Sequence, residues 1–236
     1  MTEIEKGRWH LEGADPAQVL GRLAGQEKVM IVLRHAGATH ERIGAVGAVA
    51  ADGDRFALGG PVHTARVDPA AVRRIVLDTS SEMRGKFYPA IEFQEDGDEV
   101  LFSAIAMEGA EAFVAAVDTG TRVEIAPKER RMPSMSDDTG DMSADPGFVL
   151  LDRLRAGAAE VEIRMTLDGR EQSWRGRIEE VRPAMGFANV MTGDFHLHLK
   201  AGAVADWRET PEGWVALDAD GAPTGLQVAV VPATPA

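Results

Sequence analysis

The chain contains no cysteine among its 236 residues. That absence excludes disulfides, thiolate metal sites and cysteine nucleophiles, and it removes several classes of enzyme. The sequence also has no uninterrupted apolar run of about 18 residues and no basic segment leading into an apolar one. We therefore expect neither a membrane span nor a signal peptide, and we predict a cytoplasmic protein that does not insert into membranes.

Positive charge is scarce relative to negative charge. The chain has 25 Lys and Arg residues against 38 Asp and Glu residues, which gives a formal charge of -13. A surface of this sign repels phosphate backbones and anionic membranes, so nucleic acid is not an expected partner. The hydrophobic fraction of 44% is ordinary for a globular protein.

The common catalytic and nucleotide-binding motifs are also missing. The sequence has no Walker-type loop, no G-x-S-x-G elbow and no H-E-x-x-H helix. The glycines between Gly44 and Gly53 do not have the spacing of a dinucleotide fingerprint. Hydrolase, transferase and nucleotide-binding activities therefore have no support in the sequence.

The chain does contain an internal repeat, which appears when the sequence is shifted by 132 positions. The segment "VMIVLRHAGATHERIG" (Val29 to Gly44) then lies over "VEIRMTLDGREQSWRG" (Val161 to Gly176) without a gap. Apolar positions match apolar positions, and Gly37 meets Gly169, since 169 - 37 is 132. A duplicated unit is the simplest explanation.

Helix starts and turns recur in the same order in both copies. Asp15 and Asp145 each precede a proline, a pattern typical of a capped helix start. The pairs Asp96-Gly97 and Asp220-Gly221 occupy equivalent places later in each copy, where we predict type I′ hairpin turns.

These patterns predict an α+β fold built from a tandem duplicated repeat, mostly antiparallel β-sheets with short flanking helices. The first repeat is assigned to residues 1–125 and the second to residues 145–236, joined by a polar linker at 126–144. A further helix is expected at Glu108 to Val117, which has helical spacing. Two repeats in one chain fit a monomer that is a pseudo-dimer of repeats.

The stretch "DFHLHLK" (Asp194 to Lys200) alternates apolar and polar residues and predicts a strand. Phe195, Leu197 and Leu199 then share one face, and His196 and His198 share the other. We expect His196 to be an outward-facing polar residue without a role. His35 and His40 flank a turn and are expected to be exposed.

Two segments carry a resemblance to a known family. The Val29 to Gly44 segment resembles a "VMALTRN...VHE..G" run of the HemS/ChuX-type haem-utilisation family. The segment from Trp174 to Trp207 resembles that family's "G.VE.V.P.G.W.NV...FNLHL.E..IA..W" run, with an Asn-Val pair, the Phe-x-Leu-His-Leu strand and a tryptophan in the same order. The chain looks like a shortened tandem form of this family.

The resemblance implies haem as the cofactor and indicates candidate binding residues. The internal alignment places Arg66 over His198, and the family commonly has an arginine facing haem at the first of these positions. An arginine there can order a distal ligand or pair with a propionate. His198 can line the haem pocket or make a structural hydrogen bond, and Lys200 is a candidate propionate partner by its charge.

The sequence departs from the family at the axial ligand. Strong haem binders take this ligand from a histidine between the repeats, but no histidine occurs between His63 and His196. Asp145 and Pro146 lie near the expected position. The possible substitutes are side chains of the types known to bind haem iron: His63, His198, Met132, Met135, Met142 and Tyr88.

Two functions remain open at this point. The first is a cytoplasmic haem-utilisation protein that binds haem weakly or transiently and passes it to or from a donor or acceptor protein, or helps to degrade it. Degradation would have the bound haem react with oxygen or peroxide and open its own ring. The second is a haem-independent interaction or regulatory module that keeps the fold but has lost the axial histidine.

Overall fold

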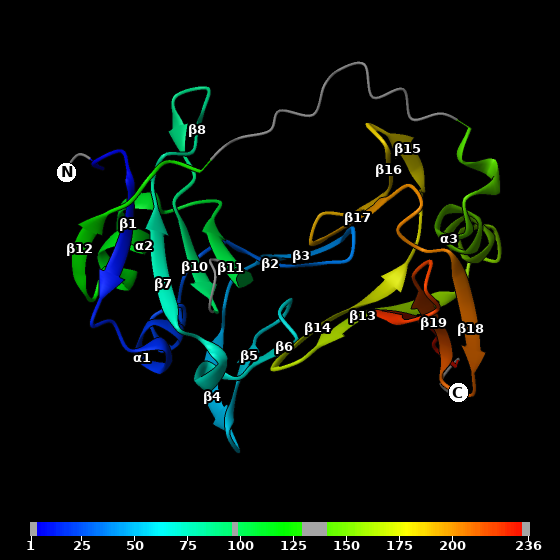
Figure 1. Ribbon diagram of the computed structural model, residues 1–236, viewed down its shortest axis with the longest axis horizontal. Coiled ribbons are helices and arrows are strands. Elements are labelled where there is room, and N and C mark those ends of the chain that lie inside the picture. Colours follow the sequence, from blue (N-terminus) through cyan, green and yellow to red (C-terminus); the bar gives the residue numbers. More distant parts are fainter. Residues whose placement is uncertain (1–3, 96–98, 129–140, 233–236) are drawn as a thin grey trace. The chain divides into compact units, whose positions relative to one another are not determined.

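The computed structural model describes residues 4–95, 99–128 and 141–232 (Figure 1). The chain divides into two compact units, and each is described here by itself. Unit 1 comprises Met1–Leu33 and Arg42–Arg130, and unit 2 comprises Arg34–Glu41 and Arg131–Ala236. The short segment Arg34–Glu41 therefore belongs to unit 2, although it lies within the first repeat of the sequence.

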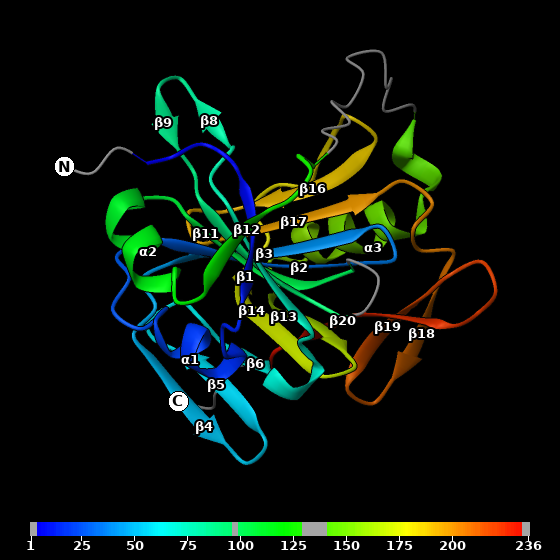
Figure 2. The same cartoon turned by 60° about the vertical axis from the view of Figure 1, so that its left-hand side comes forward.

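Unit 1 is built mainly from antiparallel strands. Its largest sheet has the order β12-β1-β7-β10-β11-β2-β3, a second has the order β6-β5-β4, and β8 and β9 form a separate pair. The elements in chain order are β1 (Arg8–Glu12), α1 (Pro16–Gly21), β2 (Val29–His35), β3 (Ala38–Gly44), β4 (Ala48–Asp52), β5 (Arg55–Gly59), β6 (Ala65–Val67), the 3-10 turn η1 (Pro69–Ala71), β7 (Arg74–Asp78), β8 (Glu82–Met83), β9 (Lys86–Phe87), β10 (Ala90–Gln94), β11 (Val100–Ala106), α2 (Ala110–Val117) and β12 (Thr121–Glu124). Helix α2 (Figure 2) lies within the segment for which a helix was predicted. Its buried residues are Phe113 and Val117.

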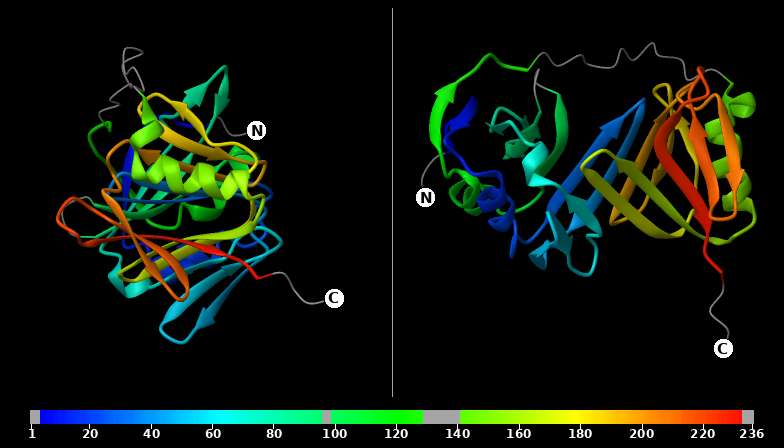
Figure 3. Two further views of the ribbon diagram at one scale, coloured as in Figure 1. Left: turned by 90° about the vertical axis from the view of Figure 1, so that its right-hand side faces the viewer. Right: turned by 60° about the horizontal axis from the view of Figure 1, so that its bottom comes forward.

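Unit 2 repeats this construction on a smaller scale. One sheet has the order β18-β19-β20-β13-β14, and the other adds β17, β16 and β15 in that order to β3. The elements in chain order are η2 (Met142–Ala144), α3 (Pro146–Ala156), β13 (Glu160–Leu167), β14 (Arg170–Arg177), β15 (Arg182–Ala184), β16 (Phe187–Met191), β17 (Phe195–Lys200), β18 (Asp206–Thr210), β19 (Gly213–Leu217) and β20 (Pro223–Val230). The views in Figure 3 show α3 against the strands of this unit.

The predicted fold class and duplication are confirmed. The segment aligned at the offset of 132 forms the hairpin of β2 and β3 in the first copy and the hairpin of β13 and β14 in the second. The aligned Ala65–Val67 and Phe195–Lys200 are likewise the strands β6 and β17. Alternating apolar residues and glycine-containing turns recur in the same order, so both copies adopt the same succession of strands.

Both predicted helix starts are confirmed. The Asp15 carboxylate accepts a hydrogen bond of 2.7 Å from the backbone N–H of Gln18. The Asp145 carboxylate accepts one of 2.9 Å from Phe148 at the start of α3. In each helix, proline occupies the first turn, where its missing N–H leaves no hydrogen bond unmade.

The predicted type I′ turn at Asp220-Gly221 is wrong in its type. A hairpin does connect β19 to β20 there, and Gly221 has a φ of 77°. A type I′ turn requires positive φ at both central positions. Asp220, however, does not have a positive φ. The Asp218 carboxylate instead accepts hydrogen bonds from the backbone of Asp220 and Ala222, which fixes a longer loop. Asp96-Gly97 lies outside the described residues.

Strand β17 has the two faces that its alternation predicts. Phe195, Leu197 and Leu199 are 0 to 1% exposed. The Phe195 ring stacks on Trp174 with ring centroids 4.5 Å apart. This side of β17 is therefore part of the core of unit 2.

The predicted exposure of His40 is wrong. His40 is fully buried, with its ring centroid 4.8 Å from that of Phe195. Its Nε2 hydrogen-bonds to the Ile163 carbonyl at 3.2 Å, and its Nδ1 lies 2.9 Å from the Gln172 side-chain nitrogen. Gln172 is the residue aligned with His40 in the internal repeat, so the side chains at the two equivalent positions contact each other. Both partners of this buried imidazole, Ile163 and Gln172, come from the second copy.

The predicted polar linker at 126–144 lies largely outside the described residues, and so do Met132 and Met135. Met142 is described and is buried at 5% exposure within η2. The repeat boundaries assigned from the sequence stay a prediction. Among the described residues, no helix combines the length and apolar character that crossing a bilayer would require.

Asp145 has a second contact that Asp15 lacks, since its other carboxylate oxygen accepts a 2.8 Å hydrogen bond from the backbone of Gly202. We expect Asp145→Ala to lower the free energy of unfolding by about 1–3 kcal/mol, because it removes both a helix cap and a link to the chain after β17. Asp15→Ala, which loses only an exposed cap, should cost about 0.5–1 kcal/mol. Urea unfolding followed by tryptophan fluorescence measures both, and equal costs would contradict the account.

Candidate functional site

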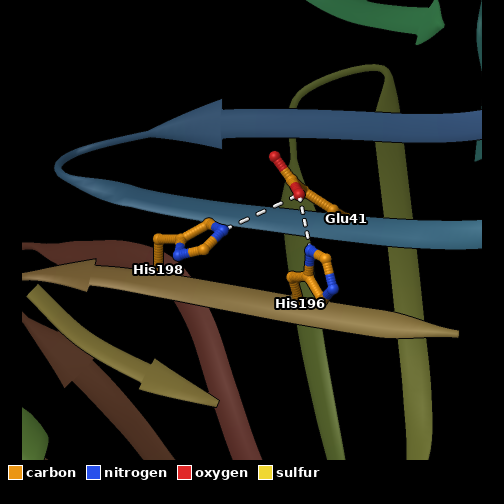
Figure 4. Close-up of side chains that lie close together, drawn as sticks. All are labelled: Glu41, His196 and His198. Atoms are coloured by element: carbon orange, nitrogen blue, oxygen red, sulfur yellow. Dashed lines mark hydrogen bonds and ion pairs between the residues drawn. The ribbon is translucent and has the colours of Figure 1, made fainter. Parts of the chain in front are cut away.

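A polar cluster lies on the face of β17 opposite the core. The Glu41 carboxylate from β3 lies between His196 and His198 from β17 (Figure 4). Its Oε2 is 3.2 Å from Nδ1 of His196 and 3.7 Å from Nε2 of His198. One ligand atom from each of the three side chains lies within 4.8 Å of the other two.

The strand pattern explains how these side chains meet. Residues two apart on a strand point to the same face, so His196 and His198 project together while Leu197 points into the core. On β3, the same alternation sends His40 to the core and Glu41 to the opposite side. All of these residues belong to unit 2.

Glu41 is a buried carboxylate, with 9% of its side chain exposed. Burial by itself would raise the pKa of Glu41, but the interactions with His196 and His198 outweigh it and lower the pKa to about 2. The group is therefore negatively charged at every ordinary pH. A buried charge of this kind requires a cation or strong hydrogen-bond donors beside it.

His198 is held in one orientation by Asn189. The Asn189 amide nitrogen donates to the backbone carbonyls of Arg182, Ala184 and Phe187 at 3.0 to 3.3 Å, which fixes the amide. Its oxygen then accepts the hydrogen bond from Nδ1 of His198 at 2.6 Å. When Nδ1 of a neutral imidazole carries the proton, Nε2 carries a lone pair. His198 thus presents a ligand nitrogen on the Glu41 side.

A cavity of about 560 Å³ adjoins this cluster within unit 2. Glu41, Asn189 and His198 line it, together with Arg34 and Arg182. Within the part of the chain that the structure describes, neither of these two arginines forms an ion pair. In a chain of charge -13, two such guanidinium groups at one cavity favour a ligand that carries carboxylates or other anionic groups.

Apart from Thr39, the remaining wall of the cavity is apolar and includes two exposed methionines. Met185 and Met191 are 53% and 57% exposed, and Ala184 and Phe187 also line the cavity. Met185 has a φ of 55°, a left-handed conformation that costs a non-glycine residue about 1–2 kcal/mol. Met185 and Gly186, whose φ is 78°, are the two central residues of the β15–β16 hairpin turn, where positive φ values fit a type I′ turn.

These groups together define the chemistry that the site can perform. The apolar wall can hold a flat hydrophobic ligand, the guanidinium groups can pair with its anionic groups, and Nε2 of His198 can bind a metal atom. The Asn189 contact is the kind of outer hydrogen bond that orients a metal-binding histidine.

The predicted site residues are distributed over both units. His198 lines the cavity, whereas Lys200, at the end of the same strand, is exposed and is not part of the lining. Arg66 lies on β6 in unit 1, where its guanidinium pairs with Asp52 at 2.8 Å. The binding roles assigned to Arg66 and Lys200 stay predictions.

The other candidate iron ligands that the sequence indicated contact groups of the protein itself. His63 is 2% exposed, and its Nε2 lies 3.0 Å from the Gly44 carbonyl. Tyr88 lies under the ammonium group of Lys86. Asp145, near the position where the family has its axial ligand, caps α3. A role of His63 or Tyr88 as an iron ligand stays a prediction.

The sequence interpretation missed Glu41 and assigned no role to His196. The segment "ATHERIG" gave no signal that distinguishes Glu41 from the many other acidic residues, because its partners are more than 150 positions away in the chain. Asn189 could have been identified as a candidate site residue from the sequence, since the Asn-Val pair was part of the family resemblance.

Solved structures of known proteins share this fold. The holo form of PhuS, a haem-binding protein from Pseudomonas aeruginosa, aligns with a TM-score of 0.73 at 17% identity, over 97% of this chain and 82% of PhuS. ChuS, a haem oxygenase from Escherichia coli, aligns with a TM-score of 0.69 at 16% identity, over 96% of this chain and 84% of ChuS. The predicted resemblance to HemS/ChuX-type proteins is thereby confirmed for the fold. No family model and no curated protein sequence matches the chain.

The burial of His63 predicts a dependence of stability on pH. Burial lowers the pKa of His63 below its ordinary value of 6.5, and the nearby charge of Arg42 lowers it further, against the hydrogen bond to Gly44. The unfolded chain therefore binds a proton below about pH 6.5 that the folded chain does not. Above that pH, His63 does not reduce the free energy of unfolding. As the pH is lowered, the free energy of unfolding should fall by at most about 1.4 kcal/mol per pH unit.

The variant His63→Gln keeps a hydrogen-bond donor but does not titrate. We expect its stability to fall less than that of the natural protein between about pH 7 and pH 5. Urea unfolding at several pH values measures the difference, and identical pH dependence in the two proteins would show that His63 does not contribute.

Proposed function

We propose that this chain is a cytoplasmic haem-utilisation protein that binds haem in the cavity beside His198 and passes it on or assists its degradation. The observation that carries the proposal is the combination, in one cavity, of an imidazole whose Nδ1 is held by Asn189, an apolar wall and two arginines. The shared fold with PhuS and ChuS supports it, since the first is a haem-binding protein and the second a haem oxygenase.

The residues at the cavity fit the chemistry of haem. A porphyrin is a flat apolar body, which Met185, Met191 and Phe187 can contact. It carries two propionates, which match the guanidinium groups of Arg34 and Arg182 in number and charge. Its iron accepts an imidazole nitrogen as an axial ligand. The cavity volume of about 560 Å³ is within the range of about 300–1,000 Å³ typical of ligand sites.

Each residue has a definable role when haem is bound. His198 would hold the iron through Nε2, and Asn189 would keep the Nδ1 proton on the far side of the ring. Arg34 and Arg182 would bind the propionates at the exposed edge. Bound haem would supply the capacity to react with oxygen or peroxide. Degradation of haem would require that reaction, whereas transfer of haem would not.

The proposed site differs in place from the one that the family resemblance implied. The start of α3, where the family's axial ligand would fall, packs on the core side of β17, since a Cβ atom on Gly147 would lie 2.6 Å from a Leu199 methyl group. His198 points to the opposite side of the same strand. A ligand on that side does not require a histidine in the segment between the repeats, which agrees with the absence of one.

The competing function is a haem-independent interaction or regulatory module. The absence of the inter-repeat histidine favours it. In this case Arg34 and Arg182 would pair with acidic groups of a partner protein. A titration with haemin separates the two functions.

The test is a visible-absorbance titration of the purified protein with haemin, beside His198→Ala and the control His35→Ala, which removes an exposed histidine on the hairpin of β2 and β3. We expect a saturable, shifted Soret band at one equivalent for the natural protein and the control. His198→Ala should bind at least about tenfold more weakly, since it loses the iron ligand. A featureless titration of the natural protein would contradict haem binding and favour the interaction module. Equal binding by His198→Ala would reject the proposed ligand.

Met185 provides a second and independent variant for the same titration. Glycine adopts the left-handed conformation without strain, so Met185→Gly should leave the free energy of unfolding within about 1 kcal/mol of the natural value. It removes an apolar contact and should therefore weaken haemin binding by several-fold. Unchanged affinity in this variant would show that the β15–β16 turn does not contact the ligand. The variant Arg66→Ala, in the same series, tests the residue implied by the family resemblance.

A further inference from the structure

In the described part of the chain, the buried Glu41 carboxylate is paired with two histidines and not with a lysine or arginine. Within the described residues, it forms no ion pair with lysine or arginine, and its two charge partners are His196 and His198. Both partners are imidazoles, which carry a positive charge only when they are protonated. Buried carboxylates in proteins are paired with cations or coordinate metal ions.

The arrangement of the three side chains matches a metal site. Atoms bound to one Zn²⁺ or Fe²⁺ ion at about 2.0–2.2 Å lie roughly 3–3.5 Å from one another. The distances from the Glu41 Oε2 to the nitrogens of His196 and His198 are 3.2 and 3.7 Å. The third separation lies within 4.8 Å, and the side chains of His196 and His198 are 23% and 29% exposed.

The nature of the ligands restricts the choice of ion. Two histidines and one carboxylate bind borderline divalent transition metals, and the same set on one face of a metal is typical of non-haem Fe²⁺ sites. Hard ions such as Mg²⁺ and Ca²⁺ prefer sites made of oxygen alone. Asn189 already orients His198 in the way that outer hydrogen bonds orient metal ligands.

We propose that Glu41, His196 and His198 form a binding site for one divalent transition-metal ion of the Fe²⁺, Co²⁺ and Zn²⁺ type. The ion would replace the hydrogen atom that now lies between Glu41 and His196 and would neutralise the buried carboxylate. Three protein ligands leave further coordination positions for water or a small ligand.

The site shares His198 with the proposed haem function but does not rest on it. His196 does not line the cavity and has no part in the proposed haem binding. The variant His196→Gln should therefore remove one metal ligand and leave haemin binding unchanged. This difference separates the failure of one proposal from the failure of the other.

The experiment uses the 236-residue chain freed of metal with a chelator. Zn²⁺ binding is measured by calorimetry, and Co²⁺ binding by its visible absorption, which reports imidazole and carboxylate coordination. We expect one ion per chain. His196→Gln should bind at least about tenfold more weakly, and His35→Gln, which alters an exposed histidine outside the cluster, should bind like the natural protein.

Unfolding curves recorded in chelator establish that each variant is folded before metal is added. A stoichiometry other than one, or equal affinity in His196→Gln and the natural protein, would overturn the proposal. Metal binding without haemin binding would support this site and reject the proposed function. Haemin binding without metal binding would support the proposed function and reject the metal site.

Discussion

The pairing of the tip of the β2–β3 hairpin with β17 is the interaction on which the candidate site depends. The Gly37 carbonyl in the turn accepts a 2.9 Å hydrogen bond from the backbone of Lys200. Gly37 allows this approach because its φ is +81° and a Cβ atom there would lie only 2.7 Å from that of Ala203. Residues 34–41 are thereby built into unit 2, and they bring Arg34 and Glu41 to the strand that carries the two histidines.

With this pairing in place, the two faces of β17 have different environments. The face with Leu197 and Leu199 packs into the core and under α3, so it fixes the strand in place. The opposite face carries a buried carboxylate, two imidazoles and a cavity with an apolar wall. The cost of burying Glu41 is offset by its histidine partners, and the strain at Met185 is tolerated within a well-paired hairpin. Both features cost folding free energy, and both lie at the same cavity.

Local patterns in the sequence were sufficient to predict much of the fold. The alternation in "DFHLHLK", the Asp-Pro helix starts and the offset of 132 all depend on neighbouring residues or on direct comparison of two segments, and the structure bears them out. The burial of His40 and the role of Glu41 could not be predicted in this way. Each depends on a partner more than 120 positions away, and no local pattern indicates that contact. The turn at Asp220 was predicted wrongly because a side chain, Asp218, selects its loop geometry.

The central claim is that Asn189 holds the proton of His198 on Nδ1, so that Nε2 is available as a ligand beside Glu41. The most direct test is a long-range proton–nitrogen NMR spectrum of the ¹⁵N-labelled, ligand-free protein at about pH 8, where imidazoles are neutral, with His198 assigned by comparison with His198→Ala. The account predicts the Nδ1-protonated tautomer for His198. Protonation at Nε2 would contradict it, because the nitrogen proposed as the ligand would then carry a hydrogen atom.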